Sequence, residues 1–133
     1  MQREFPRTFE SLEPIFRFAE EFFAQELVDE RHRYAVRFAL EEIFTNMVKY
    51  HPGNPNEITI GLDRAHDRLR ITLTDHDVDP FDPTKAEEPR TDLSLEERRV
   101  GGLGLHLTRK MMDAVEYRYV DRRSTVTLIK MLE

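Results

Sequence analysis

Glu42 and Asn46 are the first residues of this chain whose types and spacing could do chemistry. They lie four residues apart in the stretch EEIFTNMVKY, so on a helix both would project from the same face. An amide oxygen is a hard metal ligand without charge, and a carboxylate can orient or deprotonate a nucleophile. The pair would therefore suit a magnesium-bound phosphate. The alternative, an exposed pair on the solvent side of an amphipathic helix, stays open when the two residues are taken alone.

A second polar stretch, DHDVDPFD, contains four aspartates. Asp75, Asp77 and Asp79 have the spacing of positions one, three and five of a calcium-binding EF-hand loop. Position six is Pro80, where the sharp turn needs glycine, and position twelve is Ala86, where a bidentate glutamate belongs. We therefore reject a calcium loop. No pair of histidines has a helical metal-ligand spacing either.

A third stretch, RRVGGLGL, places Gly101, Gly102 and Gly104 at the start of an expected helix. Glycines leave backbone N–H groups free to approach an anion, and the helix N-terminus adds its partial positive charge. The stretch lacks the third glycine and the preceding strand of a dinucleotide fingerprint, and it is not a P-loop. A flexible hinge followed by a helix start remains the alternative interpretation.

Three helices are expected to position these residues. Apolar residues at three-and-four spacing, Phe16 and Leu27 among them, predict a first helix with Ser11 as its N-cap. A second helix should run over about residues 30–50, because the HPGNPN stretch cannot continue it cheaply. A third is expected over about residues 103–113.

Strands should supply the other layer of the fold. Apolar residues that alternate with polar ones predict strands through residues 58–62 and 69–73, and a second pair through 114–120 and 125–132. A short edge strand could lie within residues 3–9. The sequence therefore predicts an α/β (α+β) two-layer sandwich, with about three helices on one face of a mainly antiparallel mixed sheet.

Composition excludes several classes of function. The 133 residues include 20 basic and 26 acidic side chains, and the net charge of −6 argues against a dedicated nucleic-acid or anionic-membrane surface. Without cysteine there are neither disulfides nor thiolate metal sites. No signal peptide is apparent, and no apolar run approaches the roughly 20 residues that cross a bilayer. We expect one domain in the cytoplasm.

Taken together and in order, these motifs resemble the GHKL ATPase superfamily, whose nucleotide-binding domain is the Bergerat fold. EEIFTNMVKY, an aspartate that closes a strand, a long polar segment and then GGLGL occur with the family's approximate spacing. More narrowly, the chain is similar to stand-alone bacterial anti-sigma factor serine/threonine kinases. The resemblance implies a single histidine kinase-like ATPase domain over residues 1–133, with an ATP lid at about residues 76–102.

The resemblance also implies roles for individual residues. Asn46 would coordinate Mg²⁺ on the ATP phosphates, Glu42 would be the general base, and Lys49 would lie near the phosphates. Asp75 would accept a hydrogen bond from the adenine amino group. The remaining implied nucleotide contacts are Arg98, Arg99, Gly102, Gly104, Leu105 and Thr127, with Thr125 as the alternative to Thr127.

Asp77 departs from the family pattern. Family members usually have glycine two residues after the adenine aspartate, and glycine lets backbone and nucleotide approach closely. A second carboxylate here would repel phosphates if it pointed inward, although a turn residue more often faces solvent. Asp77 therefore puts nucleotide affinity in question.

Two functions follow from the resemblance. In the first, the protein phosphorylates a STAS-type anti-sigma factor antagonist with Mg-ATP and sequesters a sigma factor, as part of transcription regulation by partner switching. In the second, it is a partner-switch module of the same fold that binds nucleotide weakly or not at all. The presence of both Glu42 and Asn46 favours the kinase. The resemblance allows for a homodimer.

Overall fold

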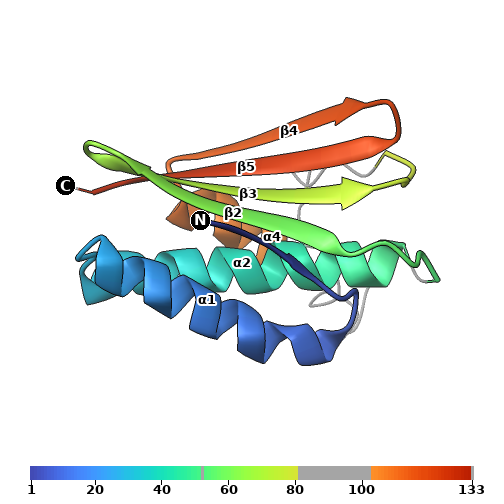
Figure 1. The fold of residues 1–133 in the computed structure, drawn as a ribbon. Helices are drawn as coiled ribbons and strands as arrows, with labels where there is room; N and C mark the ends of the chain where they lie inside the picture. Colours follow the sequence, from blue (N-terminus) through green and yellow to red (C-terminus); the bar gives the residue numbers. More distant parts are fainter. Residues whose placement is uncertain (52, 81–102, 133) are drawn as a thin grey trace.

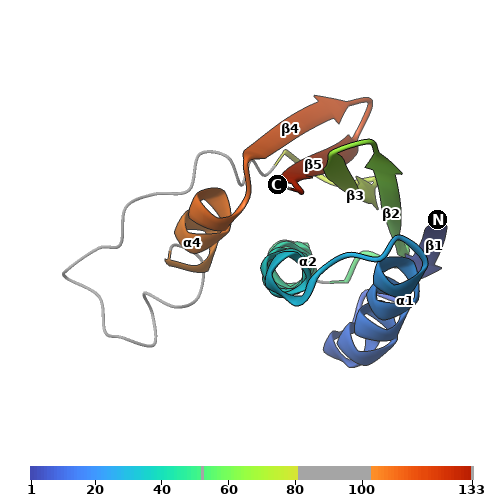
Figure 2. The same cartoon turned by 90° about the vertical axis from the view of Figure 1, so that its left-hand side faces the viewer.

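The computed structural model describes residues 1–51, 53–80 and 103–132. Helices and strands form two layers, with the helices packed against one face of the sheet (Figure 1 and Figure 2). In chain order the described elements are β1 (Gln2–Phe5), the 3-10 helix η1 (Phe9–Ser11), α1 (Leu12–Gln25), α2 (Glu30–Tyr50), β2 (Ile58–Ala65), β3 (Arg68–His76), α4 (Leu103–Met111), β4 (Ala114–Val120) and β5 (Arg123–Met131). The predicted two-layer α/β class is confirmed.

The five described strands form one sheet in the order β1-β2-β3-β5-β4. All four pairings between them are antiparallel, where the sequence favoured a mainly antiparallel mixed sheet. β3 lies at the centre, between β2 and β5. β3 is therefore hydrogen-bonded to a neighbouring strand on each side, and these bonds fix the backbone of the residues near its C-terminal end.

Helix α2 begins and ends where the sequence predicted. Asp29 is its N-cap: the backbone N–H of His32 donates to the Asp29 carboxylate at 3.0 Å, as expected for an orphan donor of the first turn. This hydrogen bond is the main cause that lowers the pKa of the Asp29 carboxyl. The helix runs for 21 residues and so carries Glu42 and Asn46 well inside its regular part.

The expected apolar face of the first helix needs correction. Leu27, predicted to be buried, is 86% exposed and has φ +54°. Because α1 ends at Gln25, the chain turns at Leu27 and buries Val28 instead. Within α1, Phe18 is fully buried and packs against Phe5.

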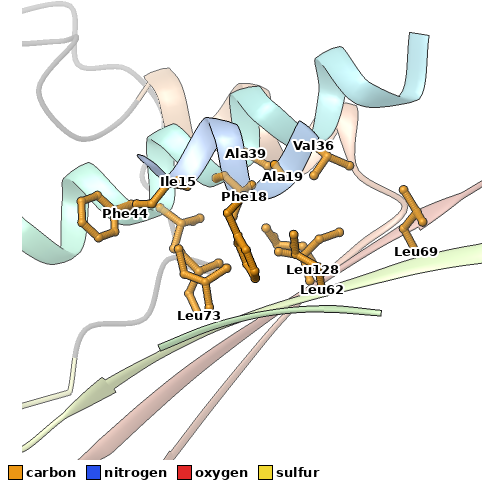
Figure 3. Close-up of a cluster of buried hydrophobic side chains, with 14 of the residues drawn as sticks. Ile15, Phe18, Ala19, Val36, Ala39, Phe44, Leu62, Leu69, Leu73 and Leu128 are labelled. Atoms are coloured by element: carbon orange, nitrogen blue, oxygen red, sulfur yellow. The ribbon is translucent and has the colours of Figure 1, made fainter. Parts of the chain in front are cut away.

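The core lies between the helices and the sheet (Figure 3). On β3, Leu69, Ile71 and Leu73 are fully buried, and each such side chain contributes about 1.5–3 kcal/mol by leaving water. Strand alternation carries the next inward position to Asp75, which is also fully buried. The register that buries the core therefore places a carboxylate on the helix-facing side of the sheet. Among the described residues, no helix is long and apolar enough to cross a membrane.

Candidate functional site

Glu42 and Asn46 are in direct contact on α2. The Asn46 Nδ2 group donates to Glu42 Oε1 at 3.0 Å and to the Glu42 backbone oxygen at 2.6 Å. These two bonds fix the orientation of the Asn46 amide, whose side chain is buried. Its Oδ1 atom is left buried without a hydrogen-bond partner. A buried acceptor without a partner costs about 1–3 kcal/mol, so this oxygen is suited to a ligand.

Asn46 and Asp75 line the same small cavity. Its lining also includes Met47, Ser124 and Val126, and its volume is about 10 Å³, no more than the space of one water. The structure thus brings together two predicted site residues that are 29 positions apart, counting from 46 to 75. Asp75 is the last residue but one of β3, which ends at His76.

Thr127 is not part of this group, which corrects the sequence-based expectation. Thr127 and its alternative Thr125 line a separate groove of about 530 Å³ on the opposite face of the sheet. The β5 hydroxyl that faces the helices is Ser124, which pairs directly with Asp75 across the strands. Alternation along β5 was the signal for this: Val126 and Leu128 are buried, so Ser124 shares their face.

Arg7 was missed by the sequence reasoning. Its guanidinium donates from Nη2 to Asp75 Oδ1 and from Nη1 to Asp75 Oδ2, the latter at 3.2 Å. Nη1 also donates to the backbone oxygen of Met47 at 3.0 Å. Nothing local in the sequence marks Arg7, because its partner is 68 residues away.

Asp77 points away from the cavity. Its backbone has φ +56°, the left-handed region that glycine enters most easily, and its side chain is 69% exposed. The carboxylate accepts from Arg122 Nε at 2.8 Å, and Asp79 accepts from Nη1 of the same arginine at 3.1 Å. Asp77 therefore fits the place of a glycine in conformation, and its charge is directed to the β4–β5 turn.

Other candidates are less well defined. Lys49 is exposed at the end of α2. Gly104 and Leu105 lie in the first turn of α4. Arg98, Arg99, Gly102 and all of the expected lid beyond residue 80 lie outside the described residues.

The donor set near Asn46 fits Mg²⁺ held mainly by a nucleotide. In the described part of the chain, no group of three His, Asp or Glu side chains could hold a metal ion. Mg²⁺ usually takes one or two protein oxygens together with waters and substrate phosphates. The unpartnered Asn46 Oδ1 is a hard oxygen of this kind. The residues present therefore fit a magnesium ion that arrives with its nucleotide.

Comparison with known proteins identifies the family. Residues 5–130 match the family described as "Histidine kinase-like ATPase domain". The chain belongs to this family. As a histidine kinase-like ATPase domain, it is expected to bind a nucleotide.

Similarity to individual proteins is consistent with this family. The serine/threonine-protein kinase BtrW of Bordetella bronchiseptica is 30% identical over 100 residues, which are 74% of this chain and 70% of BtrW. The RsbU and RsbW domains of a Mycobacterium tuberculosis protein share the fold with a TM-score of 0.70 at 14% identity. The match covers 99% of this chain and 32% of that one. In the SiaB–SiaC complex of Pseudomonas aeruginosa the TM-score is 0.60 at 14% identity, over 98% of this chain and 88% of that chain.

Proposed function

We propose that this protein is an Mg-ATP-dependent serine/threonine kinase of the partner-switching type. It would phosphorylate a STAS-type anti-sigma factor antagonist and sequester a sigma factor. The observation that carries the proposal is the Glu42–Asn46 pair, in which the carboxylate is oriented by the amide and the amide oxygen is left without a partner.

Each residue of the site would have a distinct task. Asp75 would accept a hydrogen bond from the adenine amino group, and Ser124 beside it offers a hydroxyl to the same ring. Asn46 Oδ1 would hold the magnesium ion, which supplies charge neutralisation for the phosphate oxygens. The hydrogen bond from Asn46 Nδ2 would hold the Glu42 carboxylate in position for the acceptor hydroxyl.

Glu42 would act as the general base of the transfer. As the hydroxyl oxygen of the antagonist bonds to the γ-phosphorus, its proton passes to the Glu42 carboxylate. The bond from the γ-phosphorus to the bridging oxygen breaks, and ADP leaves. Because this chemistry depends mostly on placement and charge, a positioned base and a metal-binding amide are sufficient roles for protein side chains.

The choice of partner rests on similarity. BtrW is named a serine/threonine-protein kinase, and the neighbours of known structure include an RsbW domain and SiaB in complex with SiaC. We infer by analogy that the acceptor is a small protein bound at the mouth of the nucleotide site.

Calorimetry tests the nucleotide site. Wild-type protein should bind ATP in the presence of Mg²⁺, and Asn46→Ala should weaken this binding by about 10–100-fold because the amide oxygen proposed to hold the metal is lost. Asn46→Asp, which keeps an oxygen ligand, should recover part of the affinity. Gln25→Ala, at the exposed end of α1, is the matched control. No binding by the wild type, or equal binding by Asn46→Ala, would refute the site.

One observation favours the alternative function. The cavity beside Asp75 has a volume of about 10 Å³, which is too small for a purine unless side chains move. A partner-switch module that binds nucleotide weakly would fit this closed form. The same calorimetry decides between the kinase and the module. Weak or absent binding of ATP, together with normal binding of the partner protein, supports the module.

A further inference from the structure

Arg7 and Asp75 form a buried ion pair at the adenine end of the proposed nucleotide site. The side chains are 5% and 1% exposed, respectively. The two guanidinium nitrogens bind the two carboxylate oxygens in a fork, the geometry in which arginine recognises carboxylates best. The pair is therefore rigid and dry.

The pair is not explained by stability alone. Asp75 occupies a β3 position that follows three fully buried aliphatic residues, and an apolar side chain would fit that environment. Replacing a buried ion pair by well-packed apolar residues is often neutral or stabilising. The buried Nε atom of Arg7 also has no hydrogen-bond partner, which adds a cost.

Arg7 and the cavity residue Ser124 come from opposite sides of β3 in the sheet. Arg7 follows β1, which is on the β2 side of β3, whereas Ser124 of the cavity lies on β5, on the other side of β3. Arg7 is not among the residues that line the cavity. A carboxylate has about four acceptor sites, and the fork from Arg7 uses two of them. Acceptor capacity therefore remains for a donor in the cavity.

Arg7 also connects Asp75 to the helix of the phosphate end. Its Nη1 group donates to the backbone oxygen of Met47, one of the last four carbonyls of α2, which have no partner within the helix. Met47 follows Asn46 directly. The Arg7 guanidinium thus fixes the Asp75 carboxylate relative to Met47, the neighbour of the proposed magnesium ligand Asn46.

We propose that Arg7 is a specificity-determining positioning residue, which holds Asp75 as an acceptor-only carboxylate so that the site requires a purine with an amino group at position 6. This inference rests on the proposed nucleotide site. A guanidinium offers only donors, so a carboxylate held by it presents only acceptors to the cavity. Without Arg7 the carboxylate is free to rotate, so its oxygens are no longer held in the position that accepts from a 6-amino group.

The test compares ADP with IDP, which carries an oxo group where ADP has the amino group. With Mg²⁺ present, the wild type should prefer ADP by about 10–100-fold. In the IDP complex the buried Asp75 carboxylate and the 6-oxo group are both acceptors, so neither finds a donor. Arg7→Met should reduce this ratio by at least about tenfold, because the carboxyl is no longer oriented. Arg17→Met is the matched control: it removes an arginine that is 71% exposed on α1, and the ratio should not change.

The outcomes separate the two proposals. If the wild type binds neither nucleotide, the proposed nucleotide site is wrong. If Arg7→Met weakens ADP and IDP by the same factor, Arg7 has only a structural role and this inference is overturned. If circular dichroism shows that Arg7→Met does not fold, Arg7→Lys replaces it, because lysine keeps the charge without the fork. A lower ratio in Arg7→Lys supports the inference, and a wild-type ratio in that variant overturns it.

Discussion

The two ends of the candidate site are built in opposite ways. At the base end, both oxygens of Asp75 are bound by Arg7 and the carboxylate is fully buried. At the phosphate end, Asn46 keeps an unpartnered oxygen and Glu42 is only half-buried. The difference suits the two proposed tasks: reading a base would gain from a fixed, buried acceptor, whereas a phosphate site would exchange metal, nucleotide and protein substrate. We therefore expect substitutions at the two ends to act on different measurements.

The largest expected effect is on the rate at the phosphate end. Glu42→Gln keeps the shape and the hydrogen bond from Asn46 but cannot accept a proton, so phosphate transfer from labelled ATP to a cognate antagonist should fall by about 10²–10⁴-fold. ATP affinity by calorimetry should stay within about twofold, because the base is not a binding group. Glu41→Gln, its exposed neighbour, serves as the control. An undiminished rate in Glu42→Gln would exclude Glu42 as the base.

A smaller effect, on affinity, is expected at the base end. Ser124→Ala removes the one hydroxyl of β5 that faces the cavity and should weaken ADP binding by about 2–10-fold, the value of one hydrogen bond. Thr127→Val, on the opposite face of the sheet, should leave ADP affinity unchanged. Calorimetry measures the ADP affinity of both variants. A loss in Thr127→Val with none in Ser124→Ala would contradict the placement of the adenine on the helix side.

The smallest effect is expected at Asp77, where the chain leaves β3. Glycine enters the left-handed region without strain, but Asp77→Gly also loses an exposed pair with Arg122 and gains unfolded-state entropy, so the free energy of unfolding should change by less than about 1 kcal/mol. ADP affinity should also stay within about twofold, because the Asp77 carboxylate faces Arg122. Thermal unfolding and calorimetry measure the two quantities. If Asp77→Gly binds ADP at least about tenfold more tightly than the wild type, which is the effect of about one buried hydrogen bond, Asp77 obstructs the nucleotide.

The fold was largely predictable because its signals are local. The HPGNPN stretch marks the C-terminal end of α2, and alternation marks β3 and β5, so these elements agree with the sequence-based bounds within a few residues. The prediction that Leu27 belongs to the buried helix face was wrong, because the apolar spacing continues past Gln25, where the helix ends. Spacing alone does not show the turn that follows. The family resemblance implied Thr127, whereas alternation along β5 places Ser124 on the face of the sheet that carries the buried Val126 and Leu128.

The sequence by itself determined the order of the motifs, the helix that pairs Glu42 with Asn46, and the inward position of Asp75. These depend on periods of 3.6 and two residues, which are properties of neighbouring positions. Only the tertiary structure decided that Ser124 lies opposite Asp75, that Asp77 faces Arg122, and that Arg7 binds Asp75 from 68 residues away. Such contacts depend on strand order and register, which no local pattern encodes.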